Sequence, residues 1–346
     1  VEGLKYLTMD VRHAIRMGLG AASHKLTGRR CPLNVMVSVT NRCPSNCSYC
    51  QIPQRKQREM TTDEITSMID ELALNGCARI GFWGGEPLLR DDIGDIVSRA
   101  KKRGLYVTMD TNGYLVRDKL DIVKRLDHLV ISLDGPENIH DTNREPGSFE
   151  KAMKALELVI GTVPVWTLSV LTRHSNNALH WITDLASKRG FQASFQVLHH
   201  NEFLGRGHDE LMPSNNEYQA IIRELYLLKK AGLPIINSFN YLRYVYSWGD
   251  YRISKHPGRH RNIACLAREL YCNVDTDGSL YPCSLLVDEV PAPNLLDNGF
   301  MAAFKSISPR PCESCLATCF IEYNHLFALN PATIIDWVKN MSFKSF

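Results

Sequence analysis

From Pro32 to Leu198, apolar runs typical of buried β-strands alternate with amphipathic helical segments. The predicted strands cover residues 33–40, 79–83, 105–111, 128–134, 163–171 and 191–198. The predicted helices cover residues 62–75, 91–103, 117–126, 148–160 and 177–189. A repeated strand–helix–strand order requires right-handed crossovers and a parallel sheet. The pattern alone allows either an incomplete barrel or an open doubly wound sheet.

Unusual residues follow the carboxyl ends of the first four predicted strands, where both architectures place their functional loops. A loop with three cysteines follows the first strand, and Gly-Gly-Glu-Pro at residues 84–87 follows the second. Thr-Asn-Gly at residues 111–113 follows the third, and Ser-Leu-Asp-Gly at residues 132–135, with Arg144 beyond it, closes the fourth. We therefore expect one edge of the sheet to carry a functional site.

Cys43, Cys47 and Cys50 have a C-x3-C-x2-C spacing. Three thiolates this close can bind three corners of a cubic iron–sulfur cluster, for which four cysteines are the norm. The fourth iron would then be open, and an open coordination position indicates a chemical site rather than a structural one. A structural zinc site with a fourth ligand from elsewhere is the alternative, and the spacing alone does not decide between them. A disulfide framework does not suit eleven cysteines, an odd number, in a chain of this length.

A second cysteine cluster occupies the C-terminal third of the chain. Residues 271–274 and 279–283 flank the dipeptide Asp277-Gly278, which predicts a hairpin. The cysteines of this cluster are Cys265, Cys272, Cys283, Cys312, Cys315 and Cys319. This arrangement is typical of a metal-binding module, for which structural zinc is again an alternative. Cys31 and Cys77 are expected to pack as small apolar residues.

Composition excludes some classes of protein. The net charge of +3 over 346 residues gives no indication of nucleic-acid binding. No apolar run reaches the ~18 residues of a membrane span, and a reducing cytoplasm is the expected compartment. Residues 5–26 and 332–346 are amphipathic and basic. They either contact a membrane surface peripherally, near a lipid or terpenoid substrate, or pack against the barrel, and we favour packing.

In their motifs and motif order, most of residues 32–319 resemble the radical S-adenosylmethionine (radical SAM) enzymes, in particular those with a C-terminal auxiliary-cluster module of the SPASM or Twitch kind. The resemblance implies an α/β fold, a partial (β/α)6 TIM-like barrel with a small α+β cysteine-rich domain. The expected parts are an N-terminal helical segment (1–30), the barrel (31–200), a connecting helical and aromatic segment (201–262), the auxiliary domain (263–325) and an amphipathic tail (326–346).

The resemblance also implies ligands. Cys43, Cys47 and Cys50 would hold a [4Fe–4S] cluster whose open iron is chelated by SAM. The implied SAM-binding residues are Tyr49, Gly84, Gly85, Glu86, Pro87, Thr111, Asn112, Ser132 and Arg144. Among these, the glycines would let the backbone approach the methionine moiety, Glu86 would accept from its ammonium group, and Arg144 would pair with its carboxylate. Cys265, Cys283, Cys312 and Cys315 would hold one auxiliary [4Fe–4S] cluster. Cys272 and Cys319 would then be spare, or one of them would be an alternative ligand.

The implied reaction is reductive cleavage of SAM to a 5′-deoxyadenosyl radical, which abstracts a hydrogen atom from a substrate in a biosynthetic or maturation pathway. The implied electron donor is a reduced flavodoxin or ferredoxin. The substrate class, a small molecule, a lipid or a peptide, stays open, and no catalytic residue is assigned. A non-catalytic iron–sulfur carrier or sensor, and a zinc-binding scaffold, are the rival classes; a carrier would have no use for the Gly-Gly-Glu-Pro run.

Overall fold

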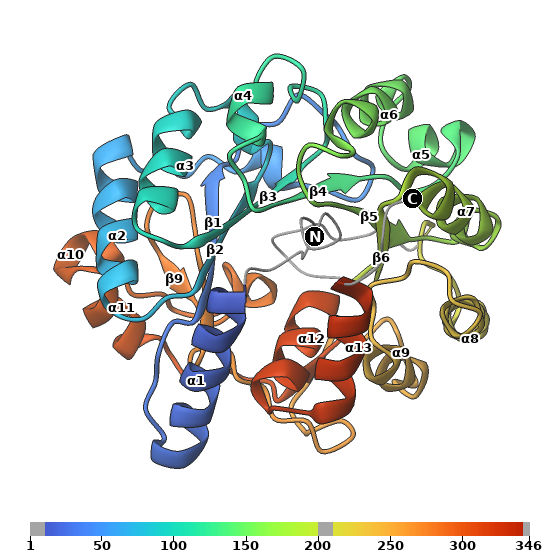
Figure 1. Ribbon diagram of the computed structural model, residues 1–346. Coiled ribbons are helices and arrows are strands. Elements are labelled where there is room, and N and C mark those ends of the chain that lie inside the picture. The colour runs from blue at the N-terminus through green and yellow to red at the C-terminus, as the bar shows by residue number, and fades with distance from the viewer. Residues whose placement is uncertain (1–10, 200–209, 342–346) are drawn as a thin grey trace.

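A curved parallel sheet forms the centre of the computed structural model, which describes residues 11–199 and 210–341 (Figure 1). Its six barrel strands are β1 (Asn34–Thr40), β2 (Arg79–Gly84), β3 (Tyr106–Thr111), β4 (His128–Ser132), β5 (Val165–Leu171) and β6 (Gln192–Val197). Neighbouring strands pair in chain order, all parallel. The six predicted strands and the partial barrel are therefore confirmed.

Helices cover the outer face of these strands. They are α2 (Thr62–Leu74), α3 (Ile93–Lys102), α4 (Leu120–Val123), α5 (Glu137–Asn143), α6 (Ser148–Val159) and α7 (Leu179–Arg189). Thr61 and Glu64 form a capping box at the start of α2. Short 3-10 turns lie at Ile52–Gln54, Pro87–Leu89, Ser175–Asn177 and Ser284–Leu286. The short α5 was not expected from the sequence, because most of its seven residues are polar.

The C-terminal hairpin joins the barrel sheet. Strand β8 (Tyr271–Val274) pairs in parallel with β1, with Cys272 opposite Val35, and β9 (Leu280–Tyr281) pairs antiparallel with β8. The sheet thus has eight strands in the order β6-β5-β4-β3-β2-β1-β8-β9. A two-stranded sheet of β7 (Lys255–His256) and β10 (Ser314–Cys315) lies apart from it. The remaining C-terminal helices are α10 (Leu295–Asn298) and α11 (Phe300–Ser306).

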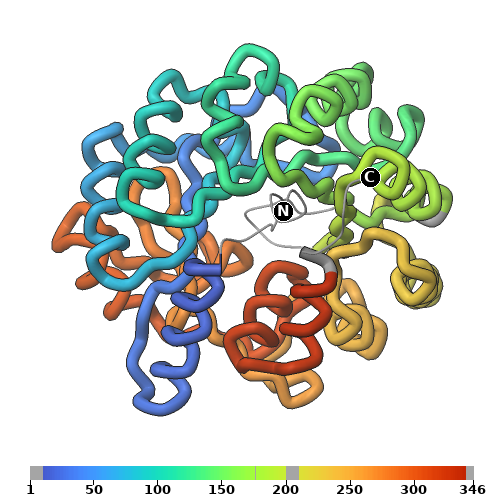
Figure 2. The backbone as a smooth tube through the Cα atoms, in the orientation of Figure 1, coloured from blue at the N-terminus to red at the C-terminus, as the bar shows by residue number. Residues whose placement is uncertain are grey.

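Three helices stand at the open side of the barrel (Figure 2). They are α1 (Val11–Thr27), α12 (Thr318–Phe327) and α13 (Pro331–Met341), and α12 contacts α1, β6 and α9. The helix predicted at 5–26 corresponds to α1, and its first residues lie outside the described part of the chain, as do the last residues of the predicted tail. Within the described ranges, no helix combines the length and apolarity that crossing a bilayer requires.

The connecting segment forms α8 (Asn215–Lys230) and α9 (Phe239–Tyr246). Its aromatic residues mostly pack into the core: Tyr241 and Tyr251 are buried, and Tyr251 donates to the carbonyl oxygen of Val245 at 2.8 Å. Tyr244 of this segment lines the C-terminal cysteine cavity described below, and Ile236 and Asn237 line a cavity inside the barrel.

Glu322 fastens α12 to its neighbours. Its buried carboxylate accepts hydrogen bonds from the backbone nitrogen of Ser238, at the start of α9, and from Nε1 of Trp337 in α13, at 2.7 and 3.2 Å. Burial raises the pKa of Glu322 to about 7, against ~4.3 in an unfolded chain. The folded state therefore holds a proton that the unfolded state releases between these values. This contribution to stability is complete below pH ~4.3 and is lost as the pH rises through about 7.

We expect Glu322→Gln to remove this pH dependence. The free energy of unfolding of the variant, relative to the wild type, should rise between pH 5 and pH 7.5, as measured by urea unfolding at both values. Glu157→Gln is the matched control, because Glu157 lies on the surface, 3.8 Å from Arg189. Parallel pH profiles for the wild type and Glu322→Gln would contradict the prediction.

Candidate active site

Cys43, Cys47 and Cys50 line a cavity of about 170 Å³ at the carboxyl edge of the sheet. Its other walls come from the ends of β2 to β5, since parallel strands end at the same edge. Among the predicted residues, those that line it are Tyr49, Gly84, Gly85, Thr111, Asn112, Ser132 and Arg144. The structure thus brings the motifs of four separate loops to one cavity. Five further residues line it that the sequence had not indicated: Ser45, Pro53, Trp83, Asp110 and Val170.

Polar donors surround the thiols. Nδ2 of Asn112 lies 3.6 Å from Sγ of Cys43, and a guanidinium nitrogen of Arg144 lies 3.7 Å from Sγ of Cys47. Burial raises the pKa of Cys43 to about 12 and that of Cys50 to about 11. These thiols would stay protonated at neutral pH unless a bound group supplied positive charge. The donor set therefore fits an iron–sulfur cluster, whose assembly releases protons from its ligands.

Gly84 and Gly85 allow two backbone segments to meet. A Cβ on Gly84 would lie 2.4 Å from the carbonyl oxygen of Thr40, and a Cβ on Gly85 would lie 2.2 Å from that of Arg42. Gly84 also has a φ of +127°, which glycine adopts most readily. We expected these glycines to make room for the methionine moiety. Their missing side chains make room for residues 40–42, from which the cysteine loop starts. Their backbone also lines the cavity, so its contact with the methionine moiety stays a prediction.

Glu86 binds the turn formed by Thr111 and Asn112. Its side chain is fully buried and accepts hydrogen bonds from the hydroxyl of Thr111 and from the backbone nitrogens of Leu88 and Asn112, at 2.9–3.1 Å. Burial raises its pKa to about 7. Neither Glu86 nor Pro87 lines the cavity. The carboxylate therefore holds the Thr111–Asn112 turn in place, and its contact with the ammonium group of SAM stays a prediction.

Asp134 is a site residue that the predictions missed. Nε of Arg144 and the hydroxyl of Tyr49 both donate to Oδ2 of Asp134, at 2.8 and 2.9 Å. Burial alone would raise the pKa of Asp134, but the charge of Arg144 and its hydrogen bonds hold that pKa below its usual value. Arg144 is therefore already paired: Nε and Nη2 both donate to Asp134, and Nη1 lies beside Cys47. The sequence did indicate that Asp134 lies near the site, because this residue belongs to the Ser-Leu-Asp-Gly motif at residues 132–135.

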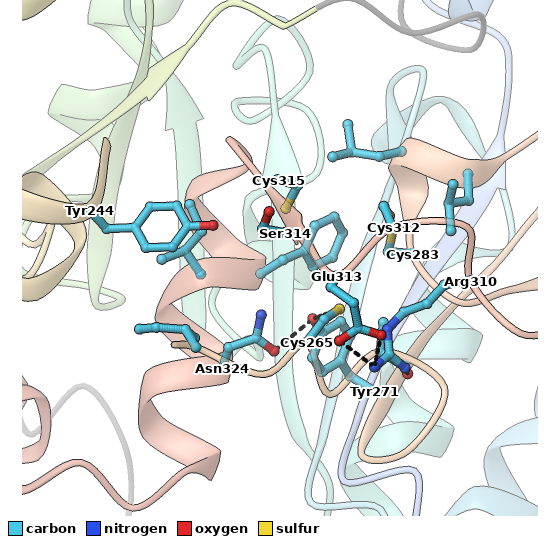
Figure 3. A pocket seen from close by; sticks show the side chains of 16 residues that line it. Tyr244, Cys265, Tyr271, Cys283, Arg310, Cys312, Glu313, Ser314, Cys315 and Asn324 are labelled. Atoms are coloured by element: carbon cyan, nitrogen blue, oxygen red, sulfur yellow. Dashed lines mark hydrogen bonds and ion pairs between the residues drawn. The ribbon is translucent and has the colours of Figure 1, made fainter. Parts of the chain in front are cut away.

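Four C-terminal thiols line a second cavity, those of Cys265, Cys283, Cys312 and Cys315 (Figure 3). Tyr244, Tyr271, Arg310 and Asn324 also line it. Sγ of Cys265 lies 3.7 Å from the hydroxyl of Tyr271. Across residues 11–199 and 210–341, no three His, Cys, Asp or Glu side chains converge closely enough to hold a single metal ion. Each set of thiols surrounds a cavity instead.

The two alternative ligands, Cys272 and Cys319, lie elsewhere, as expected if both are spare. Cys272 is buried in the main hydrophobic core, which also contains Cys77. Cys319 lines a third cavity of about 250 Å³ inside the barrel. Neither cysteine lines the cavity shared by the other four. The cause is geometric for Cys272, because β8 runs along β1 and carries that side chain to the helix-covered face.

The barrel cavity adjoins the three-cysteine cavity. Trp83 and Asp110 line both of them, from the ends of β2 and β3. Burial raises the pKa of Asp110 to about 6. A ligand inside the barrel would therefore lie next to one bound beside the three thiols, with Trp83 and Asp110 between them.

Comparison with known proteins agrees with this geometry. Residues 37–185 match the radical SAM superfamily. The chain is 26% identical to the PqqA peptide cyclase of Gluconobacter oxydans over 82% of both chains, and 28% identical to the AdoMet-dependent heme synthase of Methanosarcina barkeri over 74% of this chain and 77% of that protein. Matches to two other PqqA peptide cyclases span about half of each chain.

A solved structure, native anSMEcpe with bound AdoMet and the Cp18Cys peptide, has the same fold. It is 19% identical with a TM-score of 0.64, covering 88% of this chain and 99% of that one. Fold and sequence together define an enzyme that uses SAM and iron–sulfur chemistry. Residues 37–185 are a radical SAM domain, and the chain as a whole is similar to radical SAM enzymes that carry a C-terminal module of the SPASM/Twitch kind. In this class a [4Fe–4S] cluster and SAM supply a 5′-deoxyadenosyl radical, which abstracts a hydrogen atom from the substrate.

Proposed function

We propose that Cys43, Cys47 and Cys50 hold the SAM-binding cluster. SAM would lie in the adjoining cavity against the backbone of Gly84 and Gly85 and the side chains of Tyr49, Thr111, Asn112, Ser132 and Arg144. The substrate would lie inside the barrel, and its reacting hydrogen would lie beside Trp83 and Asp110. The observation that carries this proposal is the adjacency of the two cavities, which have these two residues in common. A radical formed in one cavity would meet the contents of the other before it met water.

Within this proposal, the protein supplies position and shielding. Glu86 would hold the Thr111–Asn112 turn, and Asp134 would fix Arg144 and Tyr49 on one wall of the SAM cavity. Asn112 and Arg144 would donate to the cluster thiolates, as their distances to Cys43 and Cys47 support. Anaerobic incubation with dithionite and SAM tests the proposal, because 5′-deoxyadenosine should form. A non-catalytic carrier or sensor would form none.

We also propose that Cys265, Cys283, Cys312 and Cys315 hold one auxiliary [4Fe–4S] cluster. Wild-type protein purified without air should then contain about eight irons, from two four-iron clusters. Cys283→Ala should contain about four, measured by iron and sulfide analysis. Cys272→Ala is the matched control and should keep about eight, because Cys272 is a core residue. Equal iron in the wild type and Cys283→Ala would contradict the assignment.

For the partners, we propose a reduced flavodoxin or ferredoxin as electron donor in a reducing cytoplasm. All eleven cysteines are free thiols in the structure, which suits such a compartment. Different observations support two substrate classes in a biosynthetic pathway: the PqqA peptide cyclase relatives and the peptide-bound anSMEcpe structure support a peptide, and the apolar wall of the barrel interior supports a lipid, as argued below. Turnover of a peptide would be seen as substrate-dependent 5′-deoxyadenosine together with a mass change in the peptide.

A further inference from the structure

The space inside the barrel, here called the lumen, continues beyond the barrel cavity of about 250 Å³ described above, which is its central part. A further cavity of about 300 Å³ lies at the amino ends of the strands. Arg79, Trp166, Tyr323 and Trp337 line both this lower cavity and the central one. Six strand residues span about 20 Å, so the two cavities together run the length of the barrel, from Trp83 and Asp110 down to α1 and α13.

The lower cavity is walled mainly by hydrocarbon. Its apolar residues include Met17 of α1, Leu326 and Phe327 of α12, and Ile334 and Trp337 of α13. A peptide in this space would bring a backbone N–H and a C=O with every residue, and each would need a partner. A hydrocarbon chain needs none, and gains free energy from the contact.

The wall of the lower cavity contains the guanidinium group of Arg79, which is held by hydrogen bonds to neutral side chains. Arg79 donates to Oδ1 of Asn34 at 2.6 Å and to the hydroxyl of Thr108 at 2.7 Å, and its guanidinium lies 5.7 Å from the ring centre of Tyr323. His128, also in the wall, is neutral, because burial lowers its pKa to about 3. Arg79 keeps its positive charge, because Asn34 and Thr108 are neutral. The carboxyl group of Asp110, on which the charge of Arg79 acts, opposes it from within the same space, so the lumen suits a ligand without net charge.

Polar groups gather at the other end of the lumen, near the three-cysteine cavity. Asp110 and Asn273 both line the central cavity. Asn273 accepts from Nε1 of Trp83 at 3.1 Å, while its own Nδ2 is buried without a hydrogen-bond partner. A carboxylate that accepts and an amide that donates suit a hydroxyl group, which does both. The lower cavity has fewer polar atoms, although Nε2 of His128 and Nε1 of Trp166 are buried in its wall without a hydrogen-bond partner. The lumen is thus more polar at the end near the three cysteines and more apolar at the other.

We propose that the lumen binds a neutral lipid or terpenoid with a hydroxylated head and one long hydrocarbon chain. The head would lie between Asp110 and Asn273, and the chain would extend into the lower cavity. Apolar side chains on the outer surface of α1 and α13, Val11, Ile15, Ile335 and Val338, are more than half exposed and suit the approach of such a molecule. We expect the carbons at the head end to undergo hydrogen abstraction, and this expectation rests on the proposed function. The binding of the molecule does not depend on the proposed function.

Binding of a polyene alcohol, cis-parinaryl alcohol, to the complete holoprotein tests the proposal by fluorescence. Displacement by 1-octanol to 1-tetradecanol should show affinity rising about fourfold per added methylene, from ~0.8 kcal/mol each. Gly18→Leu should block the lower cavity: Gly18 lines it, and a Cβ there meets no atom within 4 Å. The affinity of this variant for 1-tetradecanol should be at least ~10-fold lower than that of the wild type, since the methylenes that the new side chain displaces contribute most of the affinity.

Ser23→Leu adds the same side chain to an exposed position of α1 and is the matched control, expected to bind as the wild type does. Leucine is a better helix former than glycine, so Gly18→Leu should fold, which circular dichroism and iron content check. No saturable alcohol binding, affinity independent of chain length, unchanged binding by Gly18→Leu, or displacement by peptides alone would each overturn the proposal. Chain-length-dependent binding without 5′-deoxyadenosine formation would instead refute the proposed function and leave this one standing.

Discussion

Replacing Cys47 with alanine should reduce 5′-deoxyadenosine formation at least ~1,000-fold, because the change removes a ligand of the cofactor and not a single interaction worth a few kcal/mol. Cys47 lines the SAM cavity together with Cys43 and Cys50. The measurement is chromatography of anaerobic reactions with dithionite and SAM. Iron content should fall by the iron of one cluster, while the auxiliary cluster stays.

Cys31→Ala is the matched control for this prediction. Cys31 is also a partly buried free thiol, but its Sγ lies near the carbonyl oxygen of Asn75, 3.5 Å away, and it lines neither cysteine cavity. It should retain wild-type iron and activity. Undiminished 5′-deoxyadenosine formation by Cys47→Ala would remove the basis of the proposed function.

The second large effect is expected at the buried ion pair. Asp134→Asn should leave the guanidinium of Arg144 buried without its counter-charge, beside Cys47. Removing one partner of a buried pair costs about 3–5 kcal/mol of unfolding free energy. The affinity for SAM should fall as well, since Arg144 and Tyr49 would lose the acceptor that positions them. Urea unfolding and equilibrium dialysis of SAM measure the two effects.

A double-mutant cycle separates charge from packing. Arg144→Met should also destabilise, but the combined Asp134→Asn, Arg144→Met variant should lose less than the sum of the single changes, because neither charge is left unpaired. Glu150→Gln breaks an exposed pair with Lys154 and should have no measurable effect. Strictly additive losses in the cycle would show that the pair is not coupled.

The barrel could be predicted from the sequence because its signals are local. Each strand of the barrel is a short apolar run, and glycines such as Gly104 and Gly190 follow the helices in the left-handed conformation that ends them. The convergence of the four motif loops also followed, because parallel strands end at one edge. The motif Thr-Asn-Gly thus indicated the right place without indicating the partner of Thr111, which is Glu86.

The unpredicted parts depend on contacts between distant segments. The pairing of β8 with β1 joins residues more than 230 positions apart, and no local pattern encodes a parallel partner. The same pairing decides that Cys272 lies in the core and not at the cluster cavity. Likewise, Asp110 looks like any polar residue at a strand end until the folded barrel places it between two cavities. Tertiary structure was also required to show that Cys319 lines the barrel cavity and that Asp134 is the partner of Arg144 and Tyr49.

The pairing of β8 with β1 has a consequence for truncated or chimeric forms of this protein. Without residues 263–346, the backbone N–H and C=O groups of β1 that now bond β8 would form a bare sheet edge. Such an edge invites pairing with other molecules and aggregation. The cysteine-rich segment therefore cannot be removed without exposing the edge of the barrel sheet, because its strand β8 covers β1. Exchanging this segment between relatives would also require exchanging the residues of β1 that pair with β8.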